Sequence, residues 1–287
     1  MSLLKYVLVN VIGTVLRIIP LPCKTGLIRI GNPNSNSPVF LTCNYRLTVE
    51  RVKRALRTLD AYLLVGNSKG LNVWCASIGG HFTNHGVISV LKTTGIEEIV
   101  GHRNVILPQL AAGGVEAGII QKKTGWKVIW GPVYAKDIQA FVENNFKKTS
   151  MMRQVRFRWD QRIEMGATWA FPFSVIVAVI TALFWHRLFL PLTVIVWTLP
   201  FLIFLFFPVY SGWLNPRKKG TSFSKYTFVF DFGFITLILW GFFVCCLIIY
   251  SILAGTFNWK FILTWGFISF IIVLIISLDL MGSTPVY

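Results

Sequence analysis

The chain has 287 residues, of which 54% are hydrophobic, 15% aromatic and only 14% charged. Because a soluble domain carries about a quarter charged residues, this composition argues against an ordinary cytosolic enzyme, and its apolar content argues against disorder. The formal charge is +17, and it is spread unevenly. Residues 1–165 hold 22 basic and 9 acidic side chains, a net of +13, whereas residues 166–287 hold 6 and 2, a net of +4. We therefore expect a polar domain joined to an apolar one.

Residues 1–22 have the pattern of an amphipathic helix. Leu4, Val7, Leu8 and Val11 recur at helical spacing, and Lys5 interrupts the apolar run. No small-residue cleavage site follows, which argues against a signal peptide. We expect this segment to lie on a membrane surface or to pack on a helical bundle, with a further membrane span as the alternative.

Residues 23–148 alternate strand and helix signals. Strands separated by helices of this length predict a parallel sheet with helices on both faces, so the expected fold class is a doubly wound, Rossmann-like α/β domain. Ligands of such folds bind beyond the carboxyl ends of the strands, where Asn44, Gly66 and Pro108 fall. The expected strands are 39–44, 60–65, 98–101, 105–107 and 126–130, and the expected helices are 48–59, 77–91, 114–123 and 135–142.

The chemistry-bearing residues of this region match few common motifs. Neither a GxGxxG turn that opens a helix nor a GxxxxGK[ST] loop is present, so a nucleotide site is not indicated. A Cys–His hydrolase is an alternative, since His81 and His85 follow Cys75, although proximity in sequence says little about geometry. The cysteine spacing matches no iron–sulfur motif, so we expect no iron–sulfur cluster in this chain. The cysteines are Cys23, Cys43, Cys75, Cys245 and Cys246.

Residues 149–165 form a basic linker, and four long apolar runs follow it. A helix needs about 17–25 apolar residues to cross a bilayer core, so residues 166–287 are predicted to be a transmembrane domain of four helices, or five if the N-terminal segment also spans. Basic residues in the linker and in the loop 217–225 predict that the first 165 residues and the C-terminus lie in the cytoplasm, at the inner membrane. The basic patches then suit membrane lipid, and nucleic acid is not an expected partner. The runs are 169–185, 189–208, 227–253 and 259–280.

The segment Asn72-Val73-Trp74-Cys75-Ala76 resembles the cap-helix motif of the HgcA-type membrane corrinoid proteins, the mercury-methylating family. The corrinoid domain of that family is related to the large subunit of the corrinoid iron–sulfur protein. Further blocks resemble the same family, so the resemblance extends over residues 25–287. These blocks are 37–47, 60–65, 69–71, 106–110, 131–137, 152–162 and 281–285.

The resemblance implies a corrinoid cofactor, cobalamin or a related cobamide, with the thiolate of Cys75 as the lower axial ligand of its cobalt. A helix N-terminus would stabilise that thiolate through its dipole and free N–H groups. Asn72 is expected to form a hydrogen bond near the sulfur, and Trp74 is expected to pack beside the macrocycle. The implied cofactor-binding residues are Thr42, Asn44, Asn72, Val73, Trp74, Cys75, Ala76 and Gly80.

The implied activity is that of a membrane-anchored corrinoid-dependent methyltransferase, which carries a methyl group on cobalt and passes it to an acceptor, Hg(II) in the resembled family. A ferredoxin-like partner with two iron–sulfur clusters would supply electrons, and a methylated-pterin methyltransferase would supply the methyl group. Ile78 and Gly79 stand where the family motif has glycine and lysine. Two alternatives therefore remain: a corrinoid methyl carrier for a different acceptor, and a non-catalytic cobamide-binding sensor or storage protein.

Overall fold

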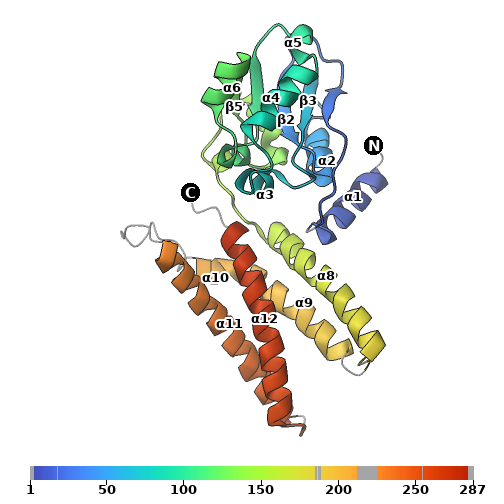
Figure 1. Cartoon of the computed structure of the whole chain (residues 1–287), viewed down its shortest axis with the longest axis vertical. Coiled ribbons are helices and arrows are strands. Elements are labelled where there is room, and N and C mark those ends of the chain that lie inside the picture. The colour runs from blue at the N-terminus through green and yellow to red at the C-terminus, as the bar shows by residue number, and fades with distance from the viewer. Residues whose placement is uncertain are drawn as a thin grey trace. The chain divides into compact units, whose positions relative to one another are not determined.

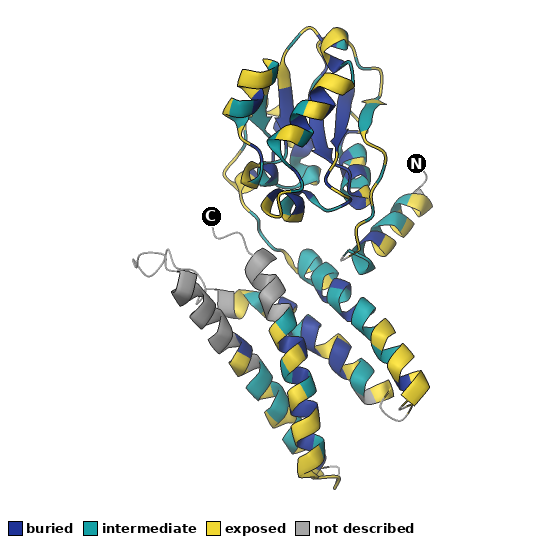
Figure 2. Ribbon diagram, viewed as in Figure 1, coloured by how far each residue is buried: buried dark blue, intermediate teal, exposed yellow. Residues whose placement is uncertain are grey.

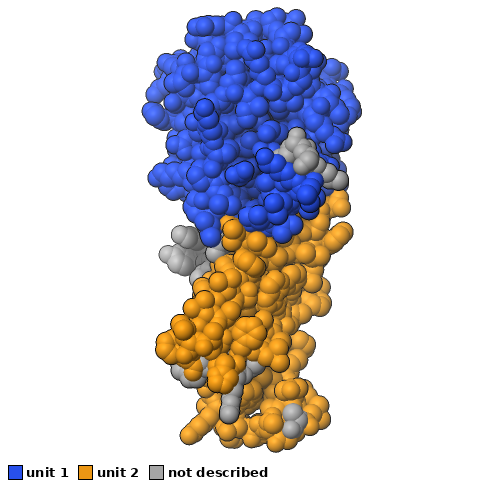
Figure 3. All heavy atoms as spheres, turned by 90° about the vertical axis from the view of Figure 1, so that its right-hand side faces the viewer, with its two compact units in different colours: residues 1–13, 17–156 blue, residues 14–16, 157–287 orange. Residues whose placement is uncertain are grey.

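A computed structural model of the chain describes residues 3–17, 19–184, 186, 189–211, 225–253 and 255–283. It divides into two compact units, which are coloured separately in Figure 3. The first unit comprises Met1–Gly13 and Arg17–Arg156, and the second comprises Thr14–Leu16 and Phe157–Tyr287. Some predicted features lie outside the described residues. They are Arg217, Lys218 and Lys219 of the basic loop, Arg187 between the first two apolar runs, and Thr284-Pro285 at the end of the last family-like block.

The first unit contains a five-stranded mixed sheet with the order β1-β3-β2-β4-β5. The last four strands in the chain run parallel to their neighbours, and β1 pairs antiparallel with β3 at the edge. The expected α/β class is therefore confirmed, but the expectation of a wholly parallel sheet is wrong. β1 is not among the predicted strands, because a half-buried edge strand of five residues gives little periodicity. The strands are β1 (Gly26–Ile30), β2 (Val39–Cys43), β3 (Ala61–Gly66), β4 (Asn104–Leu107) and β5 (Lys127–Trp130).

Helices cover both faces of this sheet (Figure 1). On one face Phe40 and Leu63 pack with residues of α2 (Arg46–Ala55) and α7 (Ile138–Glu143). On the other face Leu41 and Leu64 pack with residues of α3, α4 and α6. The central strands are therefore buried on both sides, as Figure 2 shows by their dark blue colour. The remaining elements of this unit are α1 (Leu3–Val15), α3 (Val73–Ile78), α4 (Asn84–Thr93), α5 (Ile96–Ile99), α6 (Ala117–Thr124), and the 3-10 turns η1 (Gln109–Gly113), η2 (Ala135–Asp137) and η3 (Met151–Arg153).

Two expected elements of the first unit are wrong. The helix expected over 77–91 is two helices, because the chain turns at Gly80, where φ is +69°. The N–H groups of His81 and Phe82 bond the carbonyl oxygen of Ala76 at 2.7 and 2.9 Å and close the end of α3. The strand expected over 98–101 is occupied by the end of α5, whose two glutamates lie in its first turn, where the helix dipole favours acidic side chains.

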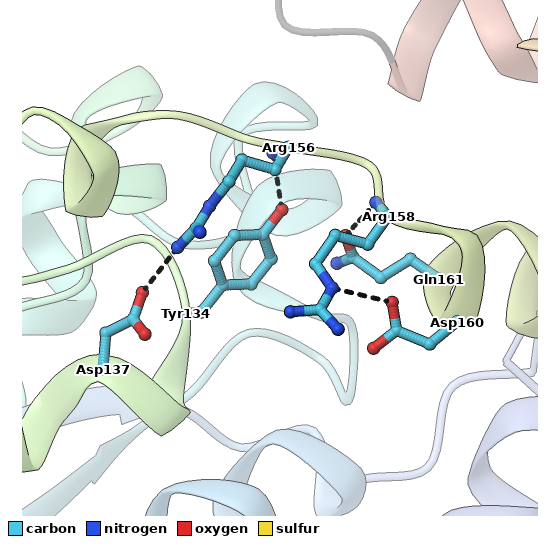
Figure 4. Close-up of polar contacts among 6 residues, drawn as sticks. All are labelled: Tyr134, Asp137, Arg156, Arg158, Asp160 and Gln161. Atoms are coloured by element: carbon cyan, nitrogen blue, oxygen red, sulfur yellow. Dashed lines mark hydrogen bonds and ion pairs between the residues drawn. The ribbon is translucent and has the colours of Figure 1, made fainter. Parts of the chain in front are cut away.

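Arg156, the last residue of the first unit, forms polar contacts with Tyr134 and Asp137. The hydroxyl oxygen of Tyr134 accepts a hydrogen bond from the backbone N–H of Arg156 at 2.7 Å, and the guanidinium of Arg156 lies 3.5 Å from a carboxylate oxygen of Asp137 (Figure 4). The start of the second unit has its own contact, because Arg158 pairs with Asp160 at 3.5 Å. Arg156 of the basic linker is therefore held by the first unit, whereas the Arg158–Asp160 contact is local to two nearby residues.

The second unit is helical and consists of five helices in the described residues. Its core is formed by apolar residues such as Leu199, Phe204, Trp265 and Val273. Three of these helical stretches are long and apolar enough to cross a membrane, Trp159–Phe184, Leu192–Val209 and Thr236–Leu253, whereas Trp259–Ile275 is shorter. The first of these helices begins at Trp159 rather than at residue 169, so the last part of the predicted linker is helical. The helices are α8 (Trp159–Phe184), α9 (Phe189–Leu205), α10 (Phe207–Ser211), α11 (Lys225–Leu253) and α12 (Trp259–Ser283).

Candidate functional site

The carboxyl ends of β2 and β4 form the natural ligand edge of the sheet. β2 leads into α2 on one face and β4 leads towards α6 on the other, so the connections diverge between two neighbouring strands. Ligands of open α/β sheets bind at such a point. Helix α3 reaches the same region, because it packs against η1, the turn that follows β4. The helix that carries the family-like motif therefore lies where the topology predicts a ligand.

Gly114 fixes the position of α3 at this edge. A Cβ atom on Gly114 would lie 2.7 Å from the carbonyl oxygen of Ser77 and would also collide with that of Phe82. Only a glycine allows the chain after η1 to approach α3 so closely. Since Ser77 belongs to α3, this contact holds the motif helix against the end of β4.

Asn72 binds both the backbone and the sulfur of Cys75. Its side-chain oxygen accepts the backbone N–H of Cys75 at 3.0 Å and caps α3, while its amide nitrogen donates to Cys75 Sγ at 3.2 Å. The sulfur is exposed, whereas Val73 and Ala76 are buried in the core and fix the helix. The expected hydrogen bond between Asn72 and the sulfur is thus present in the geometry. The group bonded to the sulfur is Asn72, and the described contacts give no support to a Cys–His pair with His81 or His85.

Cys75 is the accessible thiol of the first unit. Cys43 is buried in the sheet, and burial raises the pKa of its thiol. Cys23 is half-buried, and burial, followed by the charge of Glu50, raises the pKa of its thiol. Since the thiolate is the metal-ligating form, these two cysteines are poor ligands in the folded chain. An exposed sulfur with an amide donor beside it fits a single axial thiolate ligand better than a buried one does.

Asn44 holds the loop between β3 and α3. Its side-chain oxygen accepts hydrogen bonds from the backbone N–H of Ser68 at 2.9 Å, from the hydroxyl of Ser68 at 2.8 Å and from the N–H of Gly70 at 3.0 Å. Its amide nitrogen donates to the carbonyl oxygen of Cys23 at 3.4 Å. The structure thus gives Asn44 a positioning role, and its contact with a cofactor stays a prediction. The sequence analysis missed Ser68, since the loop carries no motif of its own.

Two buried hydroxyl groups near this edge have no hydrogen-bond partner among the described residues. They belong to Thr42, at the end of β2, and to Ser77 of α3. Buried polar atoms are almost always paired, so an orphaned hydroxyl calls for a bound group or an internal water. Thr42 was an expected cofactor residue and Ser77 was not. Of the other expected residues, Trp74 is half-buried and Gly80 forms the exposed turn after α3.

Lys148, which was not among the predicted site residues, contacts η1. Lys148 Nζ donates a hydrogen bond to the side-chain oxygen of Gln109, the first residue of that turn. Burial, followed by the charge of Arg153, lowers the pKa of Lys148. No cluster of three or more His, Cys, Asp or Glu side chains forms a metal site within the described ranges, and the expectation of no iron–sulfur cluster stays a prediction.

Comparison with known proteins gives a family match that lies mostly within the first unit. Residues 11–142 match the family CdhD, described as the CO dehydrogenase/acetyl-CoA synthase delta subunit. The match covers less than half of the chain. It includes the whole sheet and the motif helix α3.

Curated relatives match segments of similar length. The acetyl-CoA decarbonylase/synthase complex subunit gamma of Archaeoglobus fulgidus is 38% identical over 129 residues, which are 44% of this chain and 27% of that protein. The subunit of the same name from Methanopyrus kandleri is 37% identical over 43% of this chain and 27% of its own length. The corrinoid/iron-sulfur protein large subunit of Moorella thermoacetica is 33% identical over 44% of this chain and 28% of its own length. This chain therefore spans about a quarter of each of these relatives.

Proposed function

We propose that this chain is a membrane-anchored corrinoid protein that receives a methyl group on cobalt and passes it to an acceptor. The single observation that carries the proposal is the exposed sulfur of Cys75, held by Asn72 at the carboxyl edge of a CdhD-family sheet. The relative named corrinoid/iron-sulfur protein large subunit supports the choice of cofactor. The strand order, with helices on both faces, supports the doubly wound, Rossmann-like interpretation with one added edge strand.

The residues of α3 and the sheet edge would have distinct tasks. A bound corrinoid would supply a cobalt atom that takes up and releases a methyl group. Cys75 would hold the cobalt through its sulfur on the exposed side of α3, and Asn72 would hold that sulfur and stabilise the thiolate by its N–H donor. Thr42, whose hydroxyl is buried and unpaired among the described residues, stays a predicted cofactor contact. Asn44, through Ser68 and Gly70, would keep α3 in position.

We further propose that residues 166–287 anchor this unit in the inner membrane, with the corrinoid domain and the C-terminus in the cytoplasm. The support comes from three helices of sufficient length and apolarity and from the distribution of basic residues in the sequence. Four spans follow if α12 also crosses. Reporter fusions after residue 187 should then be extracytoplasmic and fusions after residue 219 cytoplasmic, and the reverse pattern would refute this topology.

Mercuric ion is the acceptor that the sequence resemblance favours. A specific observation favours a different acceptor as the second candidate. A Cβ atom at residue 79 would lie 2.9 Å from the carbonyl oxygen of Cys75, so the lysine of the family motif would not fit without a backbone shift. The end of α3 beside Cys75 thus differs from the resembled family motif at residue 79. Relatives named as subunits of a complex support work with protein partners, here a ferredoxin-like electron donor and a methylated-pterin methyltransferase.

Cobalt spectroscopy tests the proposed ligand. The full chain is purified in detergent, loaded with cobalamin and reduced to cobalt(II). We expect a base-off absorption spectrum and an electron paramagnetic resonance spectrum without nitrogen splitting in the native chain. Cys75→His should introduce nitrogen splitting, and Cys75→Ala should lose the sulfur-dependent absorption, while Cys23→Ala serves as the matched control. An identical spectrum for the native chain and Cys75→Ala would refute the assignment.

The acceptor is tested separately. Membranes that hold equal amounts of bound cobamide are supplied with a ferredoxin, a methyl donor and Hg(II), and methylmercury is measured. Formation that depends on Cys75 supports the mercury reaction. If cobamide binds but no methylmercury forms, the acceptor is a different one, and if methyl uptake also fails, the sensor or storage alternative is favoured.

A further inference from the structure

Helix α1 contacts the first unit through its polar side. Arg51 Nε of α2 donates to the side-chain oxygen of Asn10 at 2.9 Å. The guanidinium of Arg54, also in α2, lies 4.2 Å from the ring centre of Tyr6, a cation–π contact. These two contacts fall one helical turn apart on α1, so the polar residues of the helix face α2.

Gly13 adds a close backbone contact on the same side. The hydroxyl of Tyr45 donates to the carbonyl oxygen of Gly13 at 2.7 Å. A Cβ atom on Gly13 would lie 3.1 Å from Leu47 Cβ, tighter than ordinary packing, so a glycine lets the helix come this near to α2. The orientation of α1 is therefore fixed by contacts at Tyr6, Asn10 and Gly13.

The opposite side of α1 is an exposed apolar stripe. It consists of residues at i, i+3, i+4, i+7 and i+8, which lie along one side of a helix. Leu4 is 80% and Leu8 56% exposed, although both are large aliphatic side chains. A contiguous apolar surface of this kind marks an interaction site, because soluble surfaces rarely carry one. The residues of this α1 stripe are Leu4, Val7, Leu8, Val11 and Ile12.

The charge of the sequence segment that contains the α1 stripe indicates what covers the stripe. The first 49 residues contain five basic side chains and no acidic one, since Glu50 is the first acidic residue of the chain. A basic segment beside an apolar helical stripe complements an anionic lipid surface. The helix has 13 residues and is therefore about 20 Å long, less than the bilayer core of about 30 Å, so it suits a position along the surface. The five basic residues are Lys5, Arg17, Lys24, Arg29 and Arg46.

We propose that the α1 stripe docks on an anionic bilayer surface and holds the unit that carries Cys75 against the lipid by a contact of its own. The polar side of α1 is occupied by α2, and the apolar side enters the interface between headgroups and acyl chains. This inference rests on the proposed membrane location of the chain but adds a second attachment that the apolar helices of the second unit do not supply.

Site-specific fluorescence quenching tests the α1 stripe in the full chain. An environment-sensitive fluorescent amino acid replaces Leu8, and the protein is placed in nanodiscs of phosphatidylglycerol and phosphatidylethanolamine. We expect a nitroxide-labelled lipid to remove most of the emission and aqueous iodide to have little effect. The same probe at Glu98, an exposed residue of α5, should respond in the opposite way. Replacing Leu4 and Val11 by serine should reduce the lipid quenching at position 8.

Two further results would overturn the inference. A probe at position 8 that iodide quenches as strongly as the probe at Glu98 shows that water covers the α1 stripe. A probe that neither quencher reaches shows that protein covers it, either a second copy or another part of this chain. A probe at Phe242, in α11, separates these failures from failure of the membrane proposal. Lipid quenching at position 242 without quenching at position 8 refutes the docking alone, whereas absence at both refutes the membrane location.

Discussion

The two units treat apolar side chains in opposite ways. In the first unit every residue of β2 and β3 is buried, and the core lies on both faces of the sheet. In the second unit many residues along the helices are exposed (Figure 2). Large aliphatic and aromatic side chains are among them, for example Leu263 at 69%. This difference is the one expected if the proposed membrane anchor surrounds the second unit with lipid and leaves the first unit in water. The exposed Ile78 beside Cys75 and the α1 stripe are places where the first unit resembles the second.

Matched leucine truncations should give the largest difference between the units. Leu64 is fully buried in β3, so Leu64→Ala should lower the free energy of unfolding of the sheet by about 2–5 kcal/mol. Leu263→Ala in α12 removes an exposed side chain and should change the protection of its helix by less than about 0.5 kcal/mol. Amide hydrogen exchange of the full chain in detergent measures both. Equal losses would mean that the surface of α12 is packed in the native protein, and the two units would then not differ in this respect.

Matched glycine substitutions should give the next largest difference. Gly114→Ala places a methyl group against the backbone of Ser77 and Phe82, and we expect a loss of about 1–3 kcal/mol with weaker amide protection in α3. Gly241→Ala in α11 meets open space within the described residues and should be neutral or stabilising by up to about 1 kcal/mol, because alanine favours helix. Thermal unfolding and exchange of α3 amides test this pair. A tolerated Gly114→Ala would show that α3 is not held tightly against the end of β4.

The sequence pattern predicted the elements whose signal is local. β2 and β3 are continuous apolar runs with clear ends, so both were located to within a residue or two. The helix break at Gly80 was missed, although Gly79 and Gly80 favour a turn, because the segments on both sides of it are helical. α5 was missed because a single turn of helix is too short to establish a period.

The same distinction holds in the candidate site. The contact between Asn72 and Cys75 spans three residues within one helical turn, so a motif could predict it. The bonds from Ser68 to Asn44 join residues 24 positions apart, and the bond from Lys148 to Gln109 joins residues 39 apart. Such partners are brought together by the order of the strands. The residue pattern of a single segment does not specify the order of the strands.

Substitutions of Asn72 separate its two hydrogen bonds. Asn72→Ala removes the helix cap and the donor to sulfur, and we expect a local loss of about 0.5–2 kcal/mol in α3. Asn72→Asp keeps an acceptor for the Cys75 N–H but replaces the N–H donor by a negative charge. α3 should then remain folded while alkylation of Cys75 slows, because the nearby carboxylate disfavours the thiolate.

Peptide-level mass spectrometry of alkylated protein measures this effect. Cys23, which is half-buried in the first unit, is the internal reference, and its rate should not change. Faster alkylation of Cys75 in Asn72→Asp than in the native chain would show that the amide N–H does not stabilise the sulfur anion. An unchanged rate in both variants would remove Asn72 from the chemistry and leave it only the role of a cap.

The smallest expected effect is a pH dependence in the first unit. Burial, followed by the charge of Arg153, lowers the pKa of Lys148 below its usual range. Between that lowered pKa and the usual pKa of about 10.4, the unfolded chain binds more protons than the folded chain, so stability rises as pH rises through this window. The cost of holding a charged Lys148 is thus fully present at neutral pH and is lost at alkaline pH. Lys148→Gln removes this contribution.

Urea unfolding between pH 7 and 10 measures the difference between the native chain and Lys148→Gln. We expect the native midpoint to gain on the variant as pH rises, whereas Lys147→Gln, at an exposed neighbour, should run parallel to the native chain. The comparison between variants is needed because burial raises the pKa of Tyr45, and ionisation of that phenol in the unfolded chain lowers stability near the top of the range. If Lys148→Gln and Lys147→Gln show the same slope, Lys148 is solvated at η1 and does not differ from the charged surface around it.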